Sequence, residues 1–233
     1  MSDFLQSDGL TVLLIALTFI IYVLAQHLYK RTHIPLLNPI LITIAAIICL
    51  LIAADIPYET YHEGGKYIDF WLKPAVVALG FPLYKQLSAI RKQLIPIIAA
   101  ELAGCVAGVV SVVLIARFLG ASDAVVASLA AKSVTTPIAI EVTKAVGGIP
   151  PLAAAVVICV GIFGGMSGFQ IMRMSGVRSP MAGALSMGTA AHAIGTTMAI
   201  ESGGARYGAW ASLGLTLNGL LTALLTPLIL SIL

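Results

Sequence analysis

Long apolar runs separated by short polar loops fill almost the whole chain. From these runs, and from the Pro, Gly and charged residues that interrupt them, we predict spans at residues 10–28, 36–54, 68–84, 93–117, 122–145, 150–172, 181–201 and 208–232. A helix needs about 20 apolar residues to cross the hydrocarbon core of a bilayer. The pattern therefore predicts an all-α integral membrane protein, with about six spanning helices and two broken or re-entrant segments.

The composition excludes a soluble fold. Hydrophobic residues make up 59% of the 233 residues and charged residues only 10%, whereas about one quarter of an ordinary soluble domain is charged. The net charge of +3 is spread over several loops, so we expect a lipid bilayer and not nucleic acid as the partner surface. We expect one membrane domain over 1–233, in which 10–90 form a scaffold and 92–232 carry the site.

The fifth and seventh segments differ from the others because polar residues lie in their middles. The fifth contains Lys-Ser-Val-Thr-Thr-Pro at 132–137, and the seventh contains Met-Gly-Thr-Ala-Ala-His-Ala-Ile-Gly-Thr-Thr at 187–197. Backbone that leaves the helix at membrane depth is tolerated only where protein or a water-filled cavity satisfies it. We expect helix breaks at four positions: Pro74 in the short third segment, Pro137, Gly188 and Gly195.

Loop charges indicate whether the fifth segment crosses the membrane. Basic clusters occur at Lys30-Arg31, at Lys85 with Arg91-Lys92, and at Arg173 with Arg178, while the loop 55–69 is mainly acidic. If all eight segments crossed, the last basic cluster would lie opposite the first two, against the positive-inside rule. A re-entrant hairpin at 122–145 restores the rule. The alternative is that this segment crosses and the rule fails once.

The seventh segment resembles the fifth. When Thr136 is aligned with Thr196, the two sequences match weakly over six residues, and Lys132 then lies over His192. With the hairpin, each broken segment and the span before it would form one half of an inverted repeat. Inverted repeats with broken segments at the midplane are typical of secondary transporters.

Lys132 is the strongest candidate for binding. An ammonium near the bilayer centre is costly unless an anion compensates it. That anion is either a substrate carboxylate, helped by the hydroxyls of Ser133, Thr135 and Thr136, or the carboxylate of Glu101 in a purely structural pair. Glu101 is also a candidate for proton coupling.

His192 is the corresponding candidate in the seventh segment, with Thr189 and Thr196 as further hydroxyl ligands. A lone His is usually a hydrogen-bonded packing residue, but this one lies mid-segment and could bind substrate or relay protons. Gly104 and Gly108 have the spacing of a helix contact and are expected to join two copies in a homodimer. No catalytic, cofactor or metal-binding motif is present in the sequence, so we expect no enzyme, cofactor or metal.

Several strings resemble the LrgB/CidB family. They are Pro-Leu-Leu-Asn-Pro at 35–39, Lys-Pro-Ala-Val-Val-Ala-Leu at 73–79, Pro-Leu-Tyr at 82–84, Lys-Ser-Val-Thr-Thr-Pro-Ile-Ala at 132–139 and Met-Gly-Thr-Ala-Ala-His-Ala-Ile-Gly-Thr at 187–196. The resemblance implies a bacterial inner-membrane protein. It also implies one of two functions: an antiholin-like or holin-like modulator of murein hydrolase export and autolysis, or a carrier of pyruvate, glycolate or glycerate. Some members of the family act with a small LrgA/CidA-type membrane protein. Glu101 departs from the family pattern.

The residues favour the transport function. A holin-like pore needs neither a cation at the midplane nor two broken segments, whereas a transporter of small organic anions uses both. We therefore expect a secondary transporter of small monocarboxylates such as pyruvate, glycolate or lactate. An autolysis regulator with an LrgA/CidA-type partner remains the alternative.

Overall fold

The computed structural model describes residues 8–32, 34, 37, 39–78, 81, 84, 88, 91 and 93–233. Every regular element among these residues is a helix. Four of the helices are long and apolar enough to cross a membrane: Gly9–Thr32, Leu94–Phe118, Pro150–Met174 and Pro180–Ile232. The prediction of an all-α, multi-pass membrane protein is confirmed. The chain divides into two compact units, residues 1–75 and 76–233.

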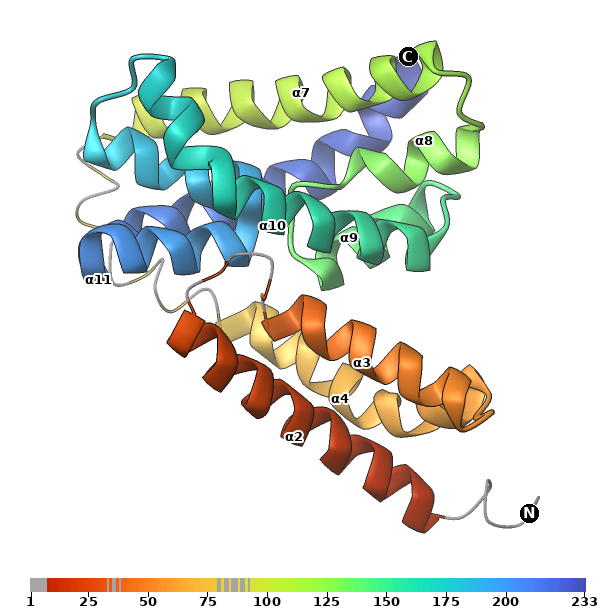
Figure 1. The fold of residues 1–233 in the computed structure, drawn as a ribbon. Coiled ribbons are helices and arrows are strands. Elements are labelled where there is room, and N and C mark those ends of the chain that lie inside the picture. Colours follow the sequence, from red (N-terminus) through yellow and green to blue (C-terminus); the bar gives the residue numbers. More distant parts are fainter. Residues whose placement is uncertain are drawn as a thin grey trace. The chain divides into compact units, whose positions relative to one another are not determined.

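The described residues of the first unit form α2 (Asp8–Thr32), α3 (Pro39–Ala53) and most of α4 (Tyr58–Ala78), which continues past residue 75 (Figure 1). Leu14 of α2 is buried with Ile47 and Leu51 of α3. Large apolar side chains also lie on the outside, where Leu24 is 65% and Ile52 is 76% exposed. Such outward apolar faces suit helices that are surrounded by lipid.

Helix α4 differs from the predicted third span. It begins at Tyr58 and not near residue 68, so most of the predicted acidic loop 55–69 is helical. An exposed ion pair one turn apart, Glu63–Lys66, supports this polar turn. Pro74 lies inside the helix and does not end it, because a proline removes only one helical hydrogen bond. Residues 36 and 38 of the second predicted span and 79, 80, 82 and 83 of the third lie outside the described residues.

From residue 93 onward the second unit contains five helices: α7 (Leu94–Phe118), α8 (Asp123–Ala130), α9 (Thr136–Ala145), α10 (Pro150–Met174) and α11 (Pro180–Ile232). The fifth predicted segment is broken, since α8 and α9 are separated by residues 131–135. Pro137 follows this break and does not cause it: it lies in the first turn of α9, where its fixed φ suits a helix start. After α9 the backbone N–H of Ile149 donates to Ser128 Oγ of α8 at 2.7 Å, so the chain returns to α8.

Helix α11 is interrupted twice. The backbone is non-helical at Ala191 and His192, and again at Gly203 and Gly204. We call the three parts the first arm (180–190), the second arm (193–202) and the third arm (205–232). The seventh predicted segment is therefore broken, but at Ala191–His192 and not at Gly188 or Gly195, which keep helical backbone on either side of the break.

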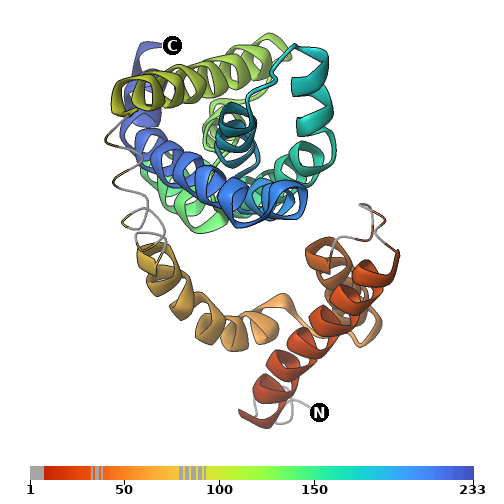
Figure 2. The ribbon, with the colours of Figure 1, turned by 90° about the vertical axis from the view of Figure 1, so that its left-hand side faces the viewer.

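Gly188 and Gly195 serve close packing. A Cβ at Gly188 would collide with the carbonyl oxygen of Ala211 in the third arm, and a Cβ at Gly195 would collide with the carbonyl oxygen of Met187. The second arm thus folds back along the first. The end-on view shows the first arm in the middle of the second unit, between α7, α10 and the third arm (Figure 2).

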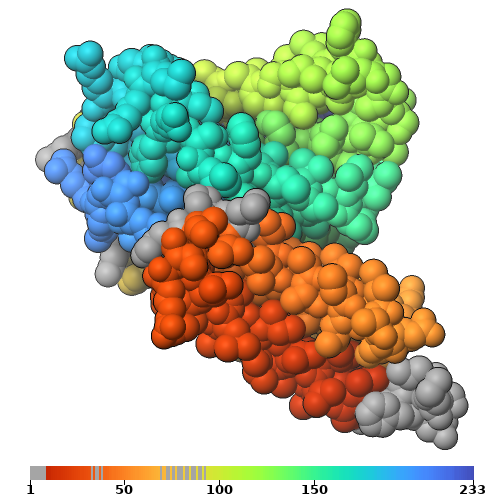
Figure 3. Space-filling view, in the orientation of Figure 1, coloured from red at the N-terminus to blue at the C-terminus, as the bar shows by residue number. Residues whose placement is uncertain are grey.

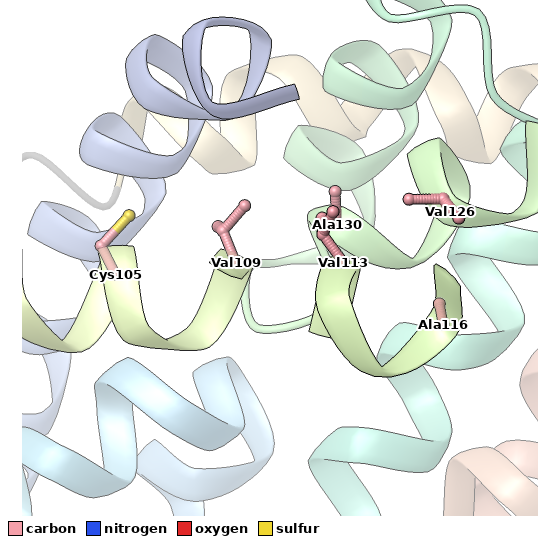
Figure 4. Packing of buried hydrophobic residues seen from close by; sticks show 6 residues of the cluster. All are labelled: Cys105, Val109, Val113, Ala116, Val126 and Ala130. Carbon is pink, nitrogen blue, oxygen red and sulfur yellow. The ribbon is translucent and has the colours of Figure 1, made fainter. Parts of the chain in front are cut away.

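One face of α7 packs against α8. Cys105, Val109 and Val113 recur every four residues, are almost completely buried and belong to one hydrophobic cluster with Val126 and Ala130 of α8 (Figure 4). This spacing places the α7 side chains in one stripe. In the space-filling view α10 lies across one face of the second unit, with its connection to α11 at one end (Figure 3).

We predict that Gly188→Ala destabilises the protein, because the added methyl group needs a shift of the third-arm backbone. Overpacking of this kind costs about 1–3 kcal/mol, so the unfolding temperature of the purified protein in detergent should fall by several degrees. Gly183→Ala is the matched control on the same arm. Its added Cβ would meet only the Phe169 ring at 3.7 Å, which is ordinary contact. Equal stability of the two variants would contradict the close approach at Gly188.

Candidate functional site

The second unit contains a cavity of about 300 Å³ between α7, the break after α8, and the first and third arms of α11. Its volume is at the lower end of the range for small-molecule sites. Its polar lining residues are Glu101, Lys132, Ser133, Ser186, Thr189, Asn218 and Thr222, and apolar residues including Ala100, Val109 and Leu185 complete the wall. Three of the predicted ligands, Lys132, Ser133 and Thr189, are thus brought together in one cavity.

Lys132 lies in the break between α8 and α9. Its Nζ donates to the carbonyl oxygen of Gly108 and to Ser133 Oγ, each at the long distance of 3.3 Å. The ion pairs in the described part of the chain are all at exposed positions and do not include Lys132 or Glu101. The structural Lys132–Glu101 pair is therefore not formed, and the ammonium in the cavity has no bound carboxylate.

Glu101 lies further along the same cavity, on α7. The residue is only 1% exposed, and its Oε1 accepts a hydrogen bond from Thr189 Oγ1 at 2.7 Å. Its Oε2 is buried without a hydrogen-bond partner among the described residues. Glu101 and Gly108, the backbone partner of Lys132, are two turns apart on α7, which separates them by about 10 Å along the helix axis.

Asn218 connects the two broken segments. Its Nδ2 donates to the carbonyl oxygen of Ser133 at 3.1 Å and to the carbonyl oxygen of Thr189 at 2.9 Å. Both carbonyls lie where helices are interrupted, so the usual helical donors are missing or displaced. One buried amide therefore satisfies backbone from both breaks. Asn218 is not among the residues predicted from the sequence, where its one signal is that it is a polar amide in the middle of the apolar segment 208–232.

The other predicted ligands do not line the cavity. His192 is buried, and its Nε2 lies 2.9 Å from the carbonyl oxygen of Val157 on α10, where Gly161 leaves room for the ring. Thr196 Oγ1 donates to the His192 carbonyl oxygen. Thr135 is the N-cap residue of α9 but makes no capping hydrogen bond, and Thr136 begins that helix.

Gly104 and Gly108, the pair predicted to join two copies, lie on α7 beside residues of the site. A Cβ at Gly104 would lie 3.4 Å from Thr189, and one at Gly108 would lie 4.0 Å from Lys132 Nζ. Both residues line the cavity. Their small size makes room for the site, and the contact between two copies that the sequence predicts for this pair stays a prediction.

Comparison with known proteins places these features in a family context. The sequence matches the LrgB-like family over residues 18–232. It is 34% identical to the uncharacterized protein YxaC of Bacillus subtilis, over 97% of each chain, and 33% identical to the holin-like protein CidB of Staphylococcus epidermidis, over 98% of each chain. No solved structure matches the chain.

We predict that Asn218→Leu lowers the stability of the protein, because it leaves the Ser133 and Thr189 carbonyls buried without a donor. Each unsatisfied group costs about 1–3 kcal/mol, so thermal unfolding in detergent should occur several degrees below that of the wild type. Thr216→Val is the control on the same arm, since the Thr216 hydroxyl bonds only to the Ser212 carbonyl one turn back. An unchanged unfolding temperature for Asn218→Leu would show that the amide is dispensable.

Proposed function

Because the chain belongs to the LrgB-like family, and because its second unit contains a cavity lined by a lysine with no ion-pair partner among the described residues, we propose that it transports small monocarboxylates across the bacterial inner membrane. The lysine carries this proposal. A half-buried ammonium at membrane depth that holds only two long hydrogen bonds is poorly compensated. A substrate carboxylate would supply the missing negative charge.

The surroundings of Lys132 suit an anion. Ser133 adds a hydroxyl donor in the same cavity. Helix α9 begins directly after the break, and its N-cap Thr135 makes no side-chain cap, so the positive end of the helix dipole is not offset there. In the proposal, Lys132 and Ser133 bind the carboxylate, and Thr189 forms part of the cavity wall opposite them. The hydroxyls of Thr135 and Thr136 would add hydrogen bonds to the carboxylate when the break opens on binding.

Two broken segments support an alternating-access mechanism. Helix α7 with α8 and α9 forms one group, and α10 with the first two arms of α11 forms the other. Their breaks meet at Asn218. We propose that the two groups are an inverted repeat of the kind found in secondary transporters. The spans of residues 10–90 would be the scaffold of a homodimer, against which the broken segments move.

A holin-like or antiholin-like regulator, acting with an LrgA/CidA-type protein, is the second candidate. The name of the CidB relative favours it. A pore or regulator requires no cavity lined by a cation without an ion-pair partner, so the site itself favours transport. Counter-flow of labelled pyruvate, lactate, glycolate and glycerate in proteoliposomes of the purified full chain separates the two, because only a carrier exchanges one anion for another without a partner protein.

We predict that Lys132→Met strongly reduces the rate of this counter-flow. Methionine keeps much of the length of the side chain but carries no charge, so the rate should fall at least about tenfold, as expected when a charge-assisted contact is lost. Lys144→Met is the matched control, because Lys144 is exposed and pairs with Glu141 one turn away. Wild-type exchange by Lys132→Met, with normal insertion into the membrane, would place the site elsewhere.

We predict that α8 and α9 form a re-entrant hairpin. Single cysteines at the exposed positions Ser122 and Ala145, introduced after replacement of Cys49, Cys105 and Cys159, should react with an impermeant thiol reagent from the same side of the membrane. A cysteine at Ser175, between α10 and α11, should react only from the other side. Labelling of the positions 122 and 145 from opposite sides would show that this segment crosses.

A further inference from the structure

Glu101 is a buried carboxyl group that the binding of an anion by Lys132 does not use. It lines the cavity, with one oxygen bound by Thr189 and the other, Oε2, without a hydrogen-bond partner among the described residues. An ionised carboxylate only accepts hydrogen bonds, whereas a protonated one also donates. Oε2 is thus a buried position, at the edge of a cavity, that can accept a proton.

The charges in the cavity depend on whether this proton is present. The titratable groups around Glu101 are Lys132, from the break after α8, and the Cys105 thiol, one turn along α7. The arms of α11 contribute Ser186, Thr189, Asn218 and Thr222, which carry no charge, and the His192 ring faces α10. Lys132 is therefore the one cation among the lining residues.

Two occupancy states then have no net charge. In the empty cavity the ammonium of Lys132 and an ionised Glu101 sum to zero charge, although the two groups do not form an ion pair. When a monocarboxylate pairs with Lys132, the carboxylate of Glu101 becomes an uncompensated buried charge, which is costly in a region of low dielectric constant. Addition of one proton to Oε2 removes that charge. The separation of about 10 Å along α7 allows a small anion and the proton to occupy different ends of the cavity.

We infer that Glu101 is the proton site of the proposed transporter, so that each monocarboxylate crosses the membrane together with one proton. This inference rests on the proposed function. The proton adds to Oε2 as the anion pairs with Lys132, and both leave on the other side, so that only an O–H bond is formed and broken. Transport is then electroneutral, and the empty carrier returns with Lys132 and Glu101 both ionised.

Wild-type protein in proteoliposomes provides the first test. Labelled lactate should accumulate when the outside is made acidic, up to about tenfold for a gradient of one pH unit, since the proton and the anion move together. A membrane potential imposed with valinomycin and potassium should have no effect on accumulation. Uptake that follows the potential, or that ignores the pH gradient, would overturn the inference.

Glu101→Gln provides the second test. Glutamine still accepts the hydrogen bond of Thr189 but cannot take up a proton, so gradient-driven uptake should fall at least about tenfold, and the counter-flow that remains should no longer vary with pH. Glu141→Gln, at an exposed position, should behave as the wild type. Glu101→Asp retains a titratable group and should keep a reduced, pH-dependent uptake. If Glu101→Gln does not fold, Glu101→Asp is compared with the wild type and with Glu141→Gln in its place.

The outcomes separate the two proposals. Absence of any counter-flow by the wild-type protein would overturn the proposed function itself. Counter-flow by the wild type, together with full gradient-driven uptake by Glu101→Gln, would overturn only the proton site. Loss of the pH dependence in His192→Gln but not in Glu101→Gln would assign the proton to the imidazole and contradict this inference.

Discussion

The second unit depends on the satisfaction of backbone groups where its helices stop. Two helical segments end inside the unit, and each break frees carbonyl groups that water cannot reach in a lipid bilayer. The amide of Asn218 donates a hydrogen bond to one carbonyl group at each break, that of Ser133 and that of Thr189. Because one side chain holds both, the breaks lie beside each other, and the space between them becomes the cavity.

Sequence patterns predicted the coarse features of this arrangement. Apolar runs located the helices, and the polar strings around Lys132 and His192 located the two breaks to within a few residues. The exact break points were not predictable, because Pro137 and Gly188 have roles that depend on their neighbours. Pro137 starts a helix, and Gly188 makes room for the carbonyl of Ala211 in a distant part of the chain.

Only some of the residues that line the cavity were predicted from the sequence. Lys132, Ser133 and Thr189 follow from the strings in which they occur. Asn218 did not stand out, since a single amide in a long apolar segment gives no spacing signal. The partners of Glu101 and His192 depend on which face of a helix meets which neighbour. A sequence without an alignment carries no such information, so the hydrogen bonds of these residues to Thr189 and Val157 had to come from the structure.

The two breaks have a similar sequence but different chemistry. At the first break an ammonium faces the cavity, while at the second the imidazole is directed into α10, where the absence of a side chain at Gly161 accommodates it. The cavity is consequently asymmetric: an anion would be held at one end by charge, while Ala100 and Leu185 bound the space around the rest of the molecule. In a site of about 300 Å³ the length of the organic tail then sets a limit on which acids fit.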